Sequence, residues 1–348
     1  MSDRKDYTHG GNIYKASEEL GIAQGKILDF SANINPLGLS PKGKKAILGN
    51  INRVLNYPDP EYRRLRLSLS SYYSVKQEHI LLGNGAIELI YSFIKNQPKG
   101  RALIPAPGFV EYEKALKREG WDVEFYNSKD EIKTKGIDLI FICNPNNPTG
   151  SSYSYGFLID LLDKCKADGT NLLIDEAFIE YSSYKTTTYE ITTYNNLYIL
   201  KSLTKFFAIP GLRLGALITS NKGFINKFNN QIIPWSINSV VEEYICSALE
   251  DYNYIKTSKK FIQKERLWLY RELNKIDNLK VFRSQGNYLL LKDKLGLDLA
   301  NILKIKGLLI RDCSNYNNLD KSYFRVAVKK RSQNRVLLKE LKSIYKGK

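Results

Sequence analysis

The sequence predicts an α/β protein, with a mostly parallel seven-stranded sheet in a large domain and a smaller C-terminal α+β domain. Two observations carry this prediction. From residue 79 to residue 219, short apolar segments alternate with amphipathic helical segments, which is typical of a parallel sheet covered by helices. From residue 236 onward, long helical patterns and fewer strands replace that alternation. The chain has 348 residues, a length that suits one large domain and a smaller one.

Seven apolar segments account for the large sheet, and amphipathic segments such as 84–96, 109–120 and 154–168 supply its covering helices. In chain order the expected strands are HILLG (79–83), RALIP (101–105), WDVEFY (121–126), IDLIFICNP (137–145), NLLIDEAF (171–178), LYILKSL (197–203) and LRLGALIT (212–219).

The rest of the chain divides into two further parts. Turn-rich stretches such as NINPLGLSP predict an irregular N-terminal arm over residues 1–45, followed by the large domain at 46–235. The small domain, 236–348, is expected to hold long helical patterns near 236–275 and a helix near 297–306. Its expected strands are LKVFRS (279–284), NYLLLK (287–292), GLLIRD (307–312) and YFRVAV (323–328), and a basic helix ends the chain.

The composition narrows the class of partner. Lys and Arg number 53 against 36 acidic residues, a net charge of +17 that could attract nucleic acid, anionic surfaces or small anions. The basic residues are spread along the chain without an arginine-rich arm, so we interpret them as a solvated surface and expect no nucleic-acid partner. A basic nucleic-acid-binding protein is kept as a distant alternative.

The sequence also has few features of a membrane-targeted or metal-binding protein. No apolar run approaches the ~18 residues of a membrane span, and the polar start lacks a signal-peptide core, so we expect a cytoplasmic protein without a membrane partner. Four scattered cysteines and two histidines predict no metal site.

Polar side chains follow three of the predicted strands where each strand ends. NPNNPTG (144–150) follows one strand, Asp175 ends the next, and Lys205 follows the third. Ligands of open α/β sheets bind beyond the carboxyl ends of the strands, so these side chains are expected to meet. A buried carboxylate needs a cationic partner, for which a protonated pyridine nitrogen is suited, and a lysine amine forms a Schiff base with an aldehyde. Both groups belong to pyridoxal phosphate.

A phosphate site is predicted beside these residues. GNGAIELI (83–90) places glycines between a strand and a helix start, which is the usual backbone site for an anion. Ser202 and Thr204 add hydroxyl groups, and Arg213 adds a planar, permanently charged guanidinium. We therefore expect Lys205 to hold the aldehyde of the cofactor and Arg213 its phosphate.

Taken together, these motifs resemble the fold-type I pyridoxal-phosphate enzymes, specifically the histidinol-phosphate aminotransferase branch, over nearly the whole chain. The resemblance makes 46–235 the cofactor-binding domain and implies a homodimer, because Tyr57 in YPDPEYRRLR matches a tyrosine that reaches the neighbouring subunit's site. It also implies that Lys205 carries the Schiff base, Asp175 pairs with the pyridine nitrogen and Asn147 bonds the phenolic oxygen. The remaining implied contacts are Phe109 stacked on the ring, Ala86, Ile87, Ser202, Thr204 and Arg213 at the phosphate, and Arg325 at the substrate carboxylate.

One position departs from that branch. Phe178 stands where DEAY commonly has a tyrosine, so a hydrogen bond to the phenolic oxygen is missing, which disfavours plain transamination.

Three further stretches are similar to the threonine-phosphate decarboxylase family of cobalamin biosynthesis: HGGNIYKASEELGI (9–22), LDFSANINPLGLSP (28–41) and GLLIRDCSNYNNL (307–319). This resemblance implies that the arm contributes to the active site and that the substrate is O-phospho-L-threonine, decarboxylated to (R)-1-amino-2-propanol phosphate. Decarboxylation of O-phosphoserine to ethanolamine phosphate and a histidinol-phosphate-type transamination stay open as alternatives. The implied substrate-binding residues are His9, Gly10, Asn33, Asn147, Arg311 and Arg325.

Overall fold

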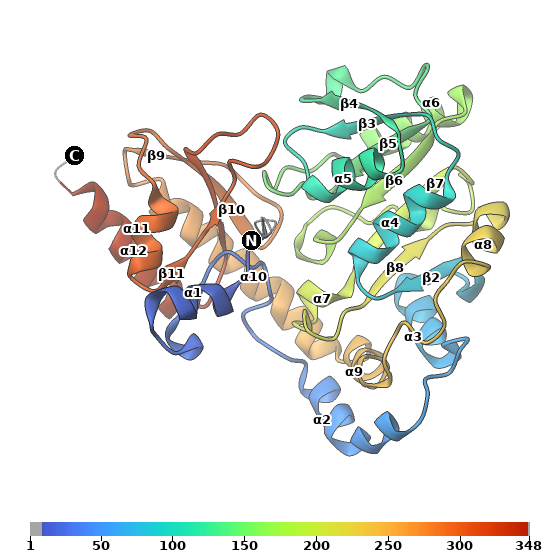
Figure 1. The fold of residues 1–348 in the computed structure, drawn as a ribbon, viewed down its shortest axis with the longest axis horizontal. Coiled ribbons are helices and arrows are strands. Elements are labelled where there is room, and N and C mark those ends of the chain that lie inside the picture. The colour runs from blue at the N-terminus through green and yellow to red at the C-terminus, as the bar shows by residue number, and fades with distance from the viewer. Residues whose placement is uncertain (1–8, 347–348) are drawn as a thin grey trace, which may run out of the picture.

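The structure, a computed structural model, describes residues 9–346 and has a large and a small lobe (Figure 1). Seven strands in the order β2-β8-β7-β6-β5-β3-β4 form the central sheet of the large lobe. Of these strands only β8 runs antiparallel to its neighbours, so the predicted mostly parallel seven-stranded sheet is confirmed. The strands are β2 (Ile80–Gly83), β3 (Arg101–Pro105), β4 (Asp122–Tyr126), β5 (Leu139–Cys143), β6 (Asn171–Asp175), β7 (Leu197–Ser202) and β8 (Gly215–Ile218).

Helices cover both faces of this sheet because successive side chains of its strands point to opposite faces. In β5, Leu139 and Phe141 pack toward the face that α4, α5 and α8 cover, whereas Ile140 and Ile142 pack toward α3 and α6. The large-lobe helices are α2 (Pro41–Gly49), α3 (Arg63–Tyr73), α4 (Ala86–Asn96), α5 (Val110–Arg118), α6 (Tyr155–Asp168), α7 (Leu203–Phe206), α8 (Lys222–Asn229) and α9 (Ser239–Leu249).

The small lobe contains an antiparallel four-stranded sheet in the order β12-β13-β10-β9 and a parallel pair formed by β1 and β11. The strands are β1 (Leu28–Asp29), β9 (Leu279–Val281), β10 (Tyr288–Asp293), β11 (Leu308–Leu309), β12 (Arg311–Asp312) and β13 (Tyr323–Ala327). The helices are α1 (Ile13–Leu20), α10 (Tyr252–Leu273), α11 (Leu299–Ile305) and α12 (Arg331–Tyr345). Short 3-10 helices occur at Gln24–Lys26, Ile51–Leu55, Gln77–His79, Lys129–Glu131, Ile179–Tyr181 and Thr188–Glu190.

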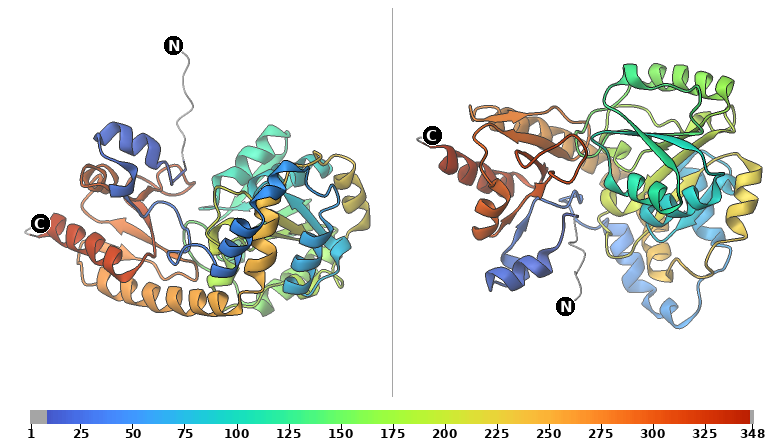
Figure 2. Two further views of the ribbon diagram at one scale, coloured as in Figure 1. Left: turned by 90° about the horizontal axis from the view of Figure 1, so that it is seen from below. Right: turned by 45° about the horizontal axis from the view of Figure 1, so that its top comes forward.

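Helix α10 joins the two lobes and runs along one side of both (Figure 2). Its Arg266 donates through Nη1 to the backbone oxygen of Tyr181 at 3.2 Å in the large lobe. The same nitrogen donates to the oxygens of Gln285 and Gly286 at 2.8 and 2.9 Å in the small lobe. This half-buried guanidinium therefore links the two lobes, as do the hydrogen bonds from Tyr288 to Asn146 and from Arg325 to Asn147. No helix within residues 9–346 is both long enough and apolar enough to cross a membrane.

Two local predictions are wrong in detail. The N-terminal arm is not irregular throughout, because Asn12 caps α1 and β1 pairs with β11 of the small lobe. The long helical patterns expected near 236–275 are confirmed as α9 and α10, which are separate because Asp251 accepts a hydrogen bond from the backbone of Tyr254 and begins the second helix. The segment GLLIRD supplies two strands to different sheets. The domain limits 1–45, 46–235 and 236–348 stay predictions.

Candidate active site

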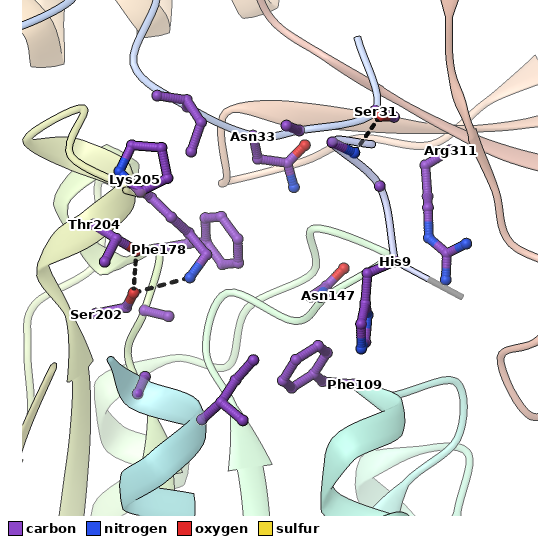
Figure 3. A pocket seen from close by; sticks show the side chains of 18 of the residues that line it. His9, Ser31, Asn33, Phe109, Asn147, Phe178, Ser202, Thr204, Lys205 and Arg311 are labelled. Carbon is purple, nitrogen blue, oxygen red and sulfur yellow. Dashed lines mark hydrogen bonds between the residues drawn. The ribbon is translucent and has the colours of Figure 1, made fainter. Parts of the chain in front are cut away.

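The predicted site residues meet at one cavity of about 500 Å³, lined by the N-terminal segment, the strand ends of the large lobe and the small lobe. Figure 3 shows Lys205 and its hydroxyl neighbours at one end, with His9 and Arg311 at the other. Tyr57 alone among the predicted site residues is not part of this lining. The predicted residues that do line it are His9, Gly10, Asn33, Ala86, Ile87, Phe109, Asn147, Asp175, Ser202, Thr204, Lys205, Arg213, Arg311 and Arg325.

Lys205 lies in the short helix that follows β7, and its Nζ donates to Ser202 Oγ at 2.9 Å. The hydroxyl groups of Ser202 and Thr204 are 3.0 Å apart. Burial lowers the pKa of Lys205 to about 8; Asp175 opposes this shift and the positive charge of Arg213 adds to it. An amine with this pKa is partly unprotonated near neutral pH and can attack an aldehyde.

Asp175 ends β6 and is almost fully buried. Its Oδ2 accepts from the hydroxyl of Tyr112 at 2.5 Å, and its Oδ1 accepts from the backbone of Ala177 at 2.8 Å. Burial raises the pKa of Asp175, while these two hydrogen bonds work against the shift. The carboxylate forms no ion pair within the described residues, so a protonated ring nitrogen placed in the cavity would supply the missing partner.

The start of α4 provides an anion site. Gly85 occupies its N-cap without a side-chain cap, and a Cβ atom added there would lie 2.4 Å from Nη2 of Arg213. The glycine therefore lets the guanidinium lie against the helix start, where the first backbone N–H groups also converge. Arg213 donates to the backbone oxygen of Pro210 at 3.3 Å and forms no ion pair within residues 9–346. This end fits the phosphate of pyridoxal phosphate.

Two further arginines reach the cavity from the small lobe. Arg311 and Arg325 are direct partners in the antiparallel pairing of β12 with β13, and both are buried. Arg311 donates to Asn315 at 2.7 Å, whereas Arg325 donates to Asn147 Oδ1 and, at 3.0 Å, to the backbone oxygen of Ser31. Nε of Arg325 is buried without a hydrogen-bond partner among residues 9–346. Two adjacent cations without an acidic partner in this part of the chain indicate a site for an anionic ligand.

The N-terminal segment closes the far side of the cavity. His9 Nε2 lies 2.9 Å from Oε1 of the buried Glu111, and its ring centroid is 6.0 Å from that of Phe109. Hydrogen bonds with His9, Lys114 and Tyr91 lower the pKa of Glu111 to about 2 against the effect of burial. Gly10 lies so close to the backbone of Ser31 that a Cβ atom would be 2.4 Å from its oxygen. Oδ1 of Asn33 is buried and has no hydrogen-bond partner in the described part of the chain.

Aromatic side chains shape the middle of the cavity. Phe109 immediately precedes α5, and its ring packs edge-on against Tyr112 at 5.6 Å. Phe178, the residue that departs from the aminotransferase pattern, places its ring 5.2 Å from Nζ of Lys205 and edge-on to Tyr288. These rings provide flat apolar surfaces of the kind that a pyridine ring stacks on.

Several residues that hold the site were missed by the sequence analysis. Tyr112 bonds Asp175, Glu111 bonds His9, and Tyr316 donates to Asn147 Oδ1 at 3.2 Å. A signal existed for Tyr112, which follows Phe109 by about one helical turn and so faces the same side. No comparable spacing links Tyr316 to Asn147.

Tyr57 is 81% exposed and its ring lies 4.8 Å from that of Trp235, away from the cavity. Its predicted role concerns a second subunit and stays a prediction.

Known proteins resemble the chain over most of its length. Residues 25–341 match the family described as aminotransferase class I and II. A threonine-phosphate decarboxylase of Salmonella typhimurium is 36% identical over 97% of this chain and 97% of that protein. The solved structure of L-threonine-O-3-phosphate decarboxylase from Porphyromonas gingivalis has a TM-score of 0.86 at 27% identity. It covers 92% of this chain and all of that one. The histidinol-phosphate aminotransferase structure from Clostridium acetobutylicum has a TM-score of 0.88 at 35% identity, with the same coverage.

Proposed function

The chain belongs to the class I and II aminotransferase family, and within it we propose that the protein decarboxylates O-phospho-L-threonine with pyridoxal phosphate as cofactor. The product would be (R)-1-amino-2-propanol phosphate, a building block for cobalamin biosynthesis. The observation that carries the proposal is the pairing of Arg311 with Arg325, without acidic partners in the described chain, in the cavity that also holds Lys205 and Asp175. A phosphoamino acid brings a phosphate and a carboxylate, which these two guanidinium groups complement.

Different residues of the cavity would contact different parts of the cofactor. When bound, pyridoxal phosphate supplies an aldehyde that condenses with amines and a ring that draws electrons from the substrate's Cα. Lys205 offers the amine and Asp175 the carboxylate for the ring nitrogen. Arg213, Ser202 and the backbone of Ala86 and Ile87 at the start of α4 would hold the phosphate, with Thr204 beside Ser202.

The substrate-binding side decides which bond is broken. The bond at Cα that stands perpendicular to the cofactor ring is the one that is weakened, so a decarboxylase must hold its substrate with the carboxylate in that position. His9 and Arg311 lie at the end of the cavity away from Lys205 (Figure 3), and Asn33 and Arg325 also line the cavity. Held at both its phosphate and its carboxylate, the substrate would have one orientation, and Cα–H would lie away from the perpendicular.

A second candidate is a histidinol-phosphate-type transamination, because the Clostridium acetobutylicum structure of that name is 35% identical to the chain. Two features favour the decarboxylase over it. The near-full-length similarity to the Salmonella typhimurium decarboxylase is as high, and Phe178 leaves out the phenol of the aminotransferase pattern. O-Phosphoserine is a further candidate substrate, since one methyl group is worth only ~1 kcal/mol of burial.

We also propose a homodimer in which Tyr57 reaches the partner's cavity. Tyr57 and Trp235 form an exposed pair of aromatic rings that a second copy of the chain could cover. Sedimentation would measure the oligomeric state, and mixing Tyr57→Ala with Lys205→Ala chains should restore activity above that of either variant. A monomer, or no restoration after subunit exchange, would contradict the shared site. Exposed apolar residues also occur nearby along the chain, on α2 and the 3-10 helix that follows it: Leu48, Ile51, Val54 and Leu55.

A product assay tests the function itself. The protein loaded with pyridoxal phosphate is given O-phosphothreonine with and without 2-oxoglutarate, while carbon dioxide and primary amine are measured. Release of carbon dioxide without the keto acid is expected. Strict dependence on the keto acid, with no carbon dioxide, would assign the protein to the aminotransferases, and a parallel series with O-phosphoserine ranks the two substrates.

A further inference from the structure

The side-chain amide of Asn147 has a fixed orientation. Its Oδ1 accepts hydrogen bonds from Nη1 of Arg325 and from the hydroxyl of Tyr316. A guanidinium can only donate, so the atom that faces Arg325 must be the oxygen of the amide. Nδ2 has no acceptor within residues 9–346 and is left for the cavity that Asn147 lines (Figure 3). Nδ2 of Asn147 is therefore a donor of fixed orientation that can bond an acceptor atom of a group bound in the cavity.

Tyr316 is well placed to hold this amide. It follows β12, is 4% exposed and packs with Leu290 and Cys313 in a small apolar cluster. The guanidinium of Arg311 lies 5.4 Å from the centre of its ring. The same side chain therefore contacts an anion-binding arginine through its ring and an amide of the large lobe through its hydroxyl. Burial on both sides leaves the phenol little freedom to turn away from Asn147.

Among the described residues, 9–346, Tyr316 is also the single phenol in the cavity lining. Phe178, the aromatic residue next to Lys205, has no hydroxyl to offer. We propose that Tyr316 is a positioning residue that fixes the Asn147 amide, so that Nδ2 donates to the ring oxygen of the bound cofactor. The inference rests on the proposed cofactor chemistry, and it adds a residue of the small lobe that acts on the cofactor only through Asn147.

The consequence can be measured without substrate. A hydrogen bond to an anionic ring oxygen stabilises the negative charge after the neighbouring lysine-derived nitrogen has lost its proton. When the donor is held less firmly, the proton stays on that nitrogen to higher pH. The pH midpoint of the visible absorbance of the loaded protein should therefore rise in Tyr316→Phe, by about half a pH unit.

The experiment compares absorbance titrations of the wild type, Tyr316→Phe and Tyr345→Phe. Tyr345 is a matched control because it is a buried small-lobe tyrosine whose hydroxyl donates to Asp293, not to a cavity residue. We expect a raised midpoint in Tyr316→Phe alone, and no further effect of Tyr316→Phe in an Asn147→Ala background. An unchanged midpoint, or an equal shift in the Asn147→Ala background, would overturn the inference.

These outcomes are separate from those of the product assay. Absorbance that shifts as expected, in a protein that releases no carbon dioxide, would overturn the decarboxylase and support the role of Tyr316. If the loaded protein showed no visible absorbance attributable to Lys205, both the decarboxylase and the role of Tyr316 would be overturned.

Discussion

Arg311 of β12 and Arg325 of β13 lie directly opposite each other in the small-lobe sheet. Neither forms an ion pair with an acidic side chain within residues 9–346, although Asn315 and Asn147 accept hydrogen bonds from them. Like charges at opposite positions destabilise an antiparallel strand pair. The arrangement is therefore unfavourable for the empty fold and favourable once an anion lies between the two guanidinium groups.

Arg311→Gln should weaken substrate binding and spare cofactor binding. One charge-assisted hydrogen bond contributes about 1.5–3 kcal/mol, so the KM for O-phosphothreonine should rise about tenfold or more. Arg335→Gln removes the same charge from the exposed face of α12 and should change neither quantity. Steady-state kinetics and a titration with pyridoxal phosphate measure the two effects. An unchanged KM for Arg311→Gln would remove the residue from the substrate site.

Gly85→Ala should impair the phosphate end of the cavity. The new Cβ would lie 2.4 Å from Nη2 of Arg213, and the backbone φ of +90° is one that alanine rarely adopts. We expect a loss of stability of about 1–3 kcal/mol and a weaker affinity for pyridoxal phosphate. Gly211→Ala is the control, because Gly211 belongs to the same loop as Arg213 and a Cβ there meets nothing within 4 Å. Equal behaviour of the two variants in thermal unfolding and cofactor titration would contradict this account.

The part of the site that could be predicted consists of residues whose signal is local. Asp175 and Lys205 follow apolar strands in the sequence, and the topology of a parallel sheet brings such strand ends to one edge. Gly85 could be identified in the same way, from its place between a strand and a helix. The sheet and the cofactor could therefore be predicted from the pattern of apolar segments and from the positions of these residues along the chain.

The remaining features depend on contacts between distant parts of the chain. Tyr316 lies 169 residues from Asn147 and Glu111 lies 102 residues from His9, so no short spacing signals either pair. The break between β11 and β12 is hidden in the same way, because one apolar segment supplies both strands. Only the packing of the arm against the small lobe separates them.

Tyr112→Phe should weaken the electrostatic support of the cofactor ring. The lost hydroxyl donates to Asp175 at 2.5 Å, and without it burial would raise the pKa of that carboxyl further. A less acidic Asp175 is a poorer partner for a protonated ring nitrogen, so kcat should fall about tenfold, corresponding to ~1.4 kcal/mol. Tyr126→Phe is the control, because its buried hydroxyl donates to the backbone oxygen of Phe141 in the same sheet. If both variants lost activity equally, the loss would reflect the fold and not Asp175.

Lys205 should react with aldehydes at a lower pH than other lysines of the chain. Burial lowers its pKa from 10.5 to about 8, with Asp175 opposing and Arg213 assisting the shift. The folded protein thus holds fewer protons than the unfolded chain between pH 8 and 10.5, and this group's contribution to stability rises with pH across that window. Borohydride trapping with pyridoxal, followed by mass spectrometry of the peptides, should show labelling of Lys205 with a midpoint near pH 8. Lys264, exposed on α10, is the control within the same chain. Parallel labelling of the two lysines at every pH would mean that the cavity does not activate Lys205.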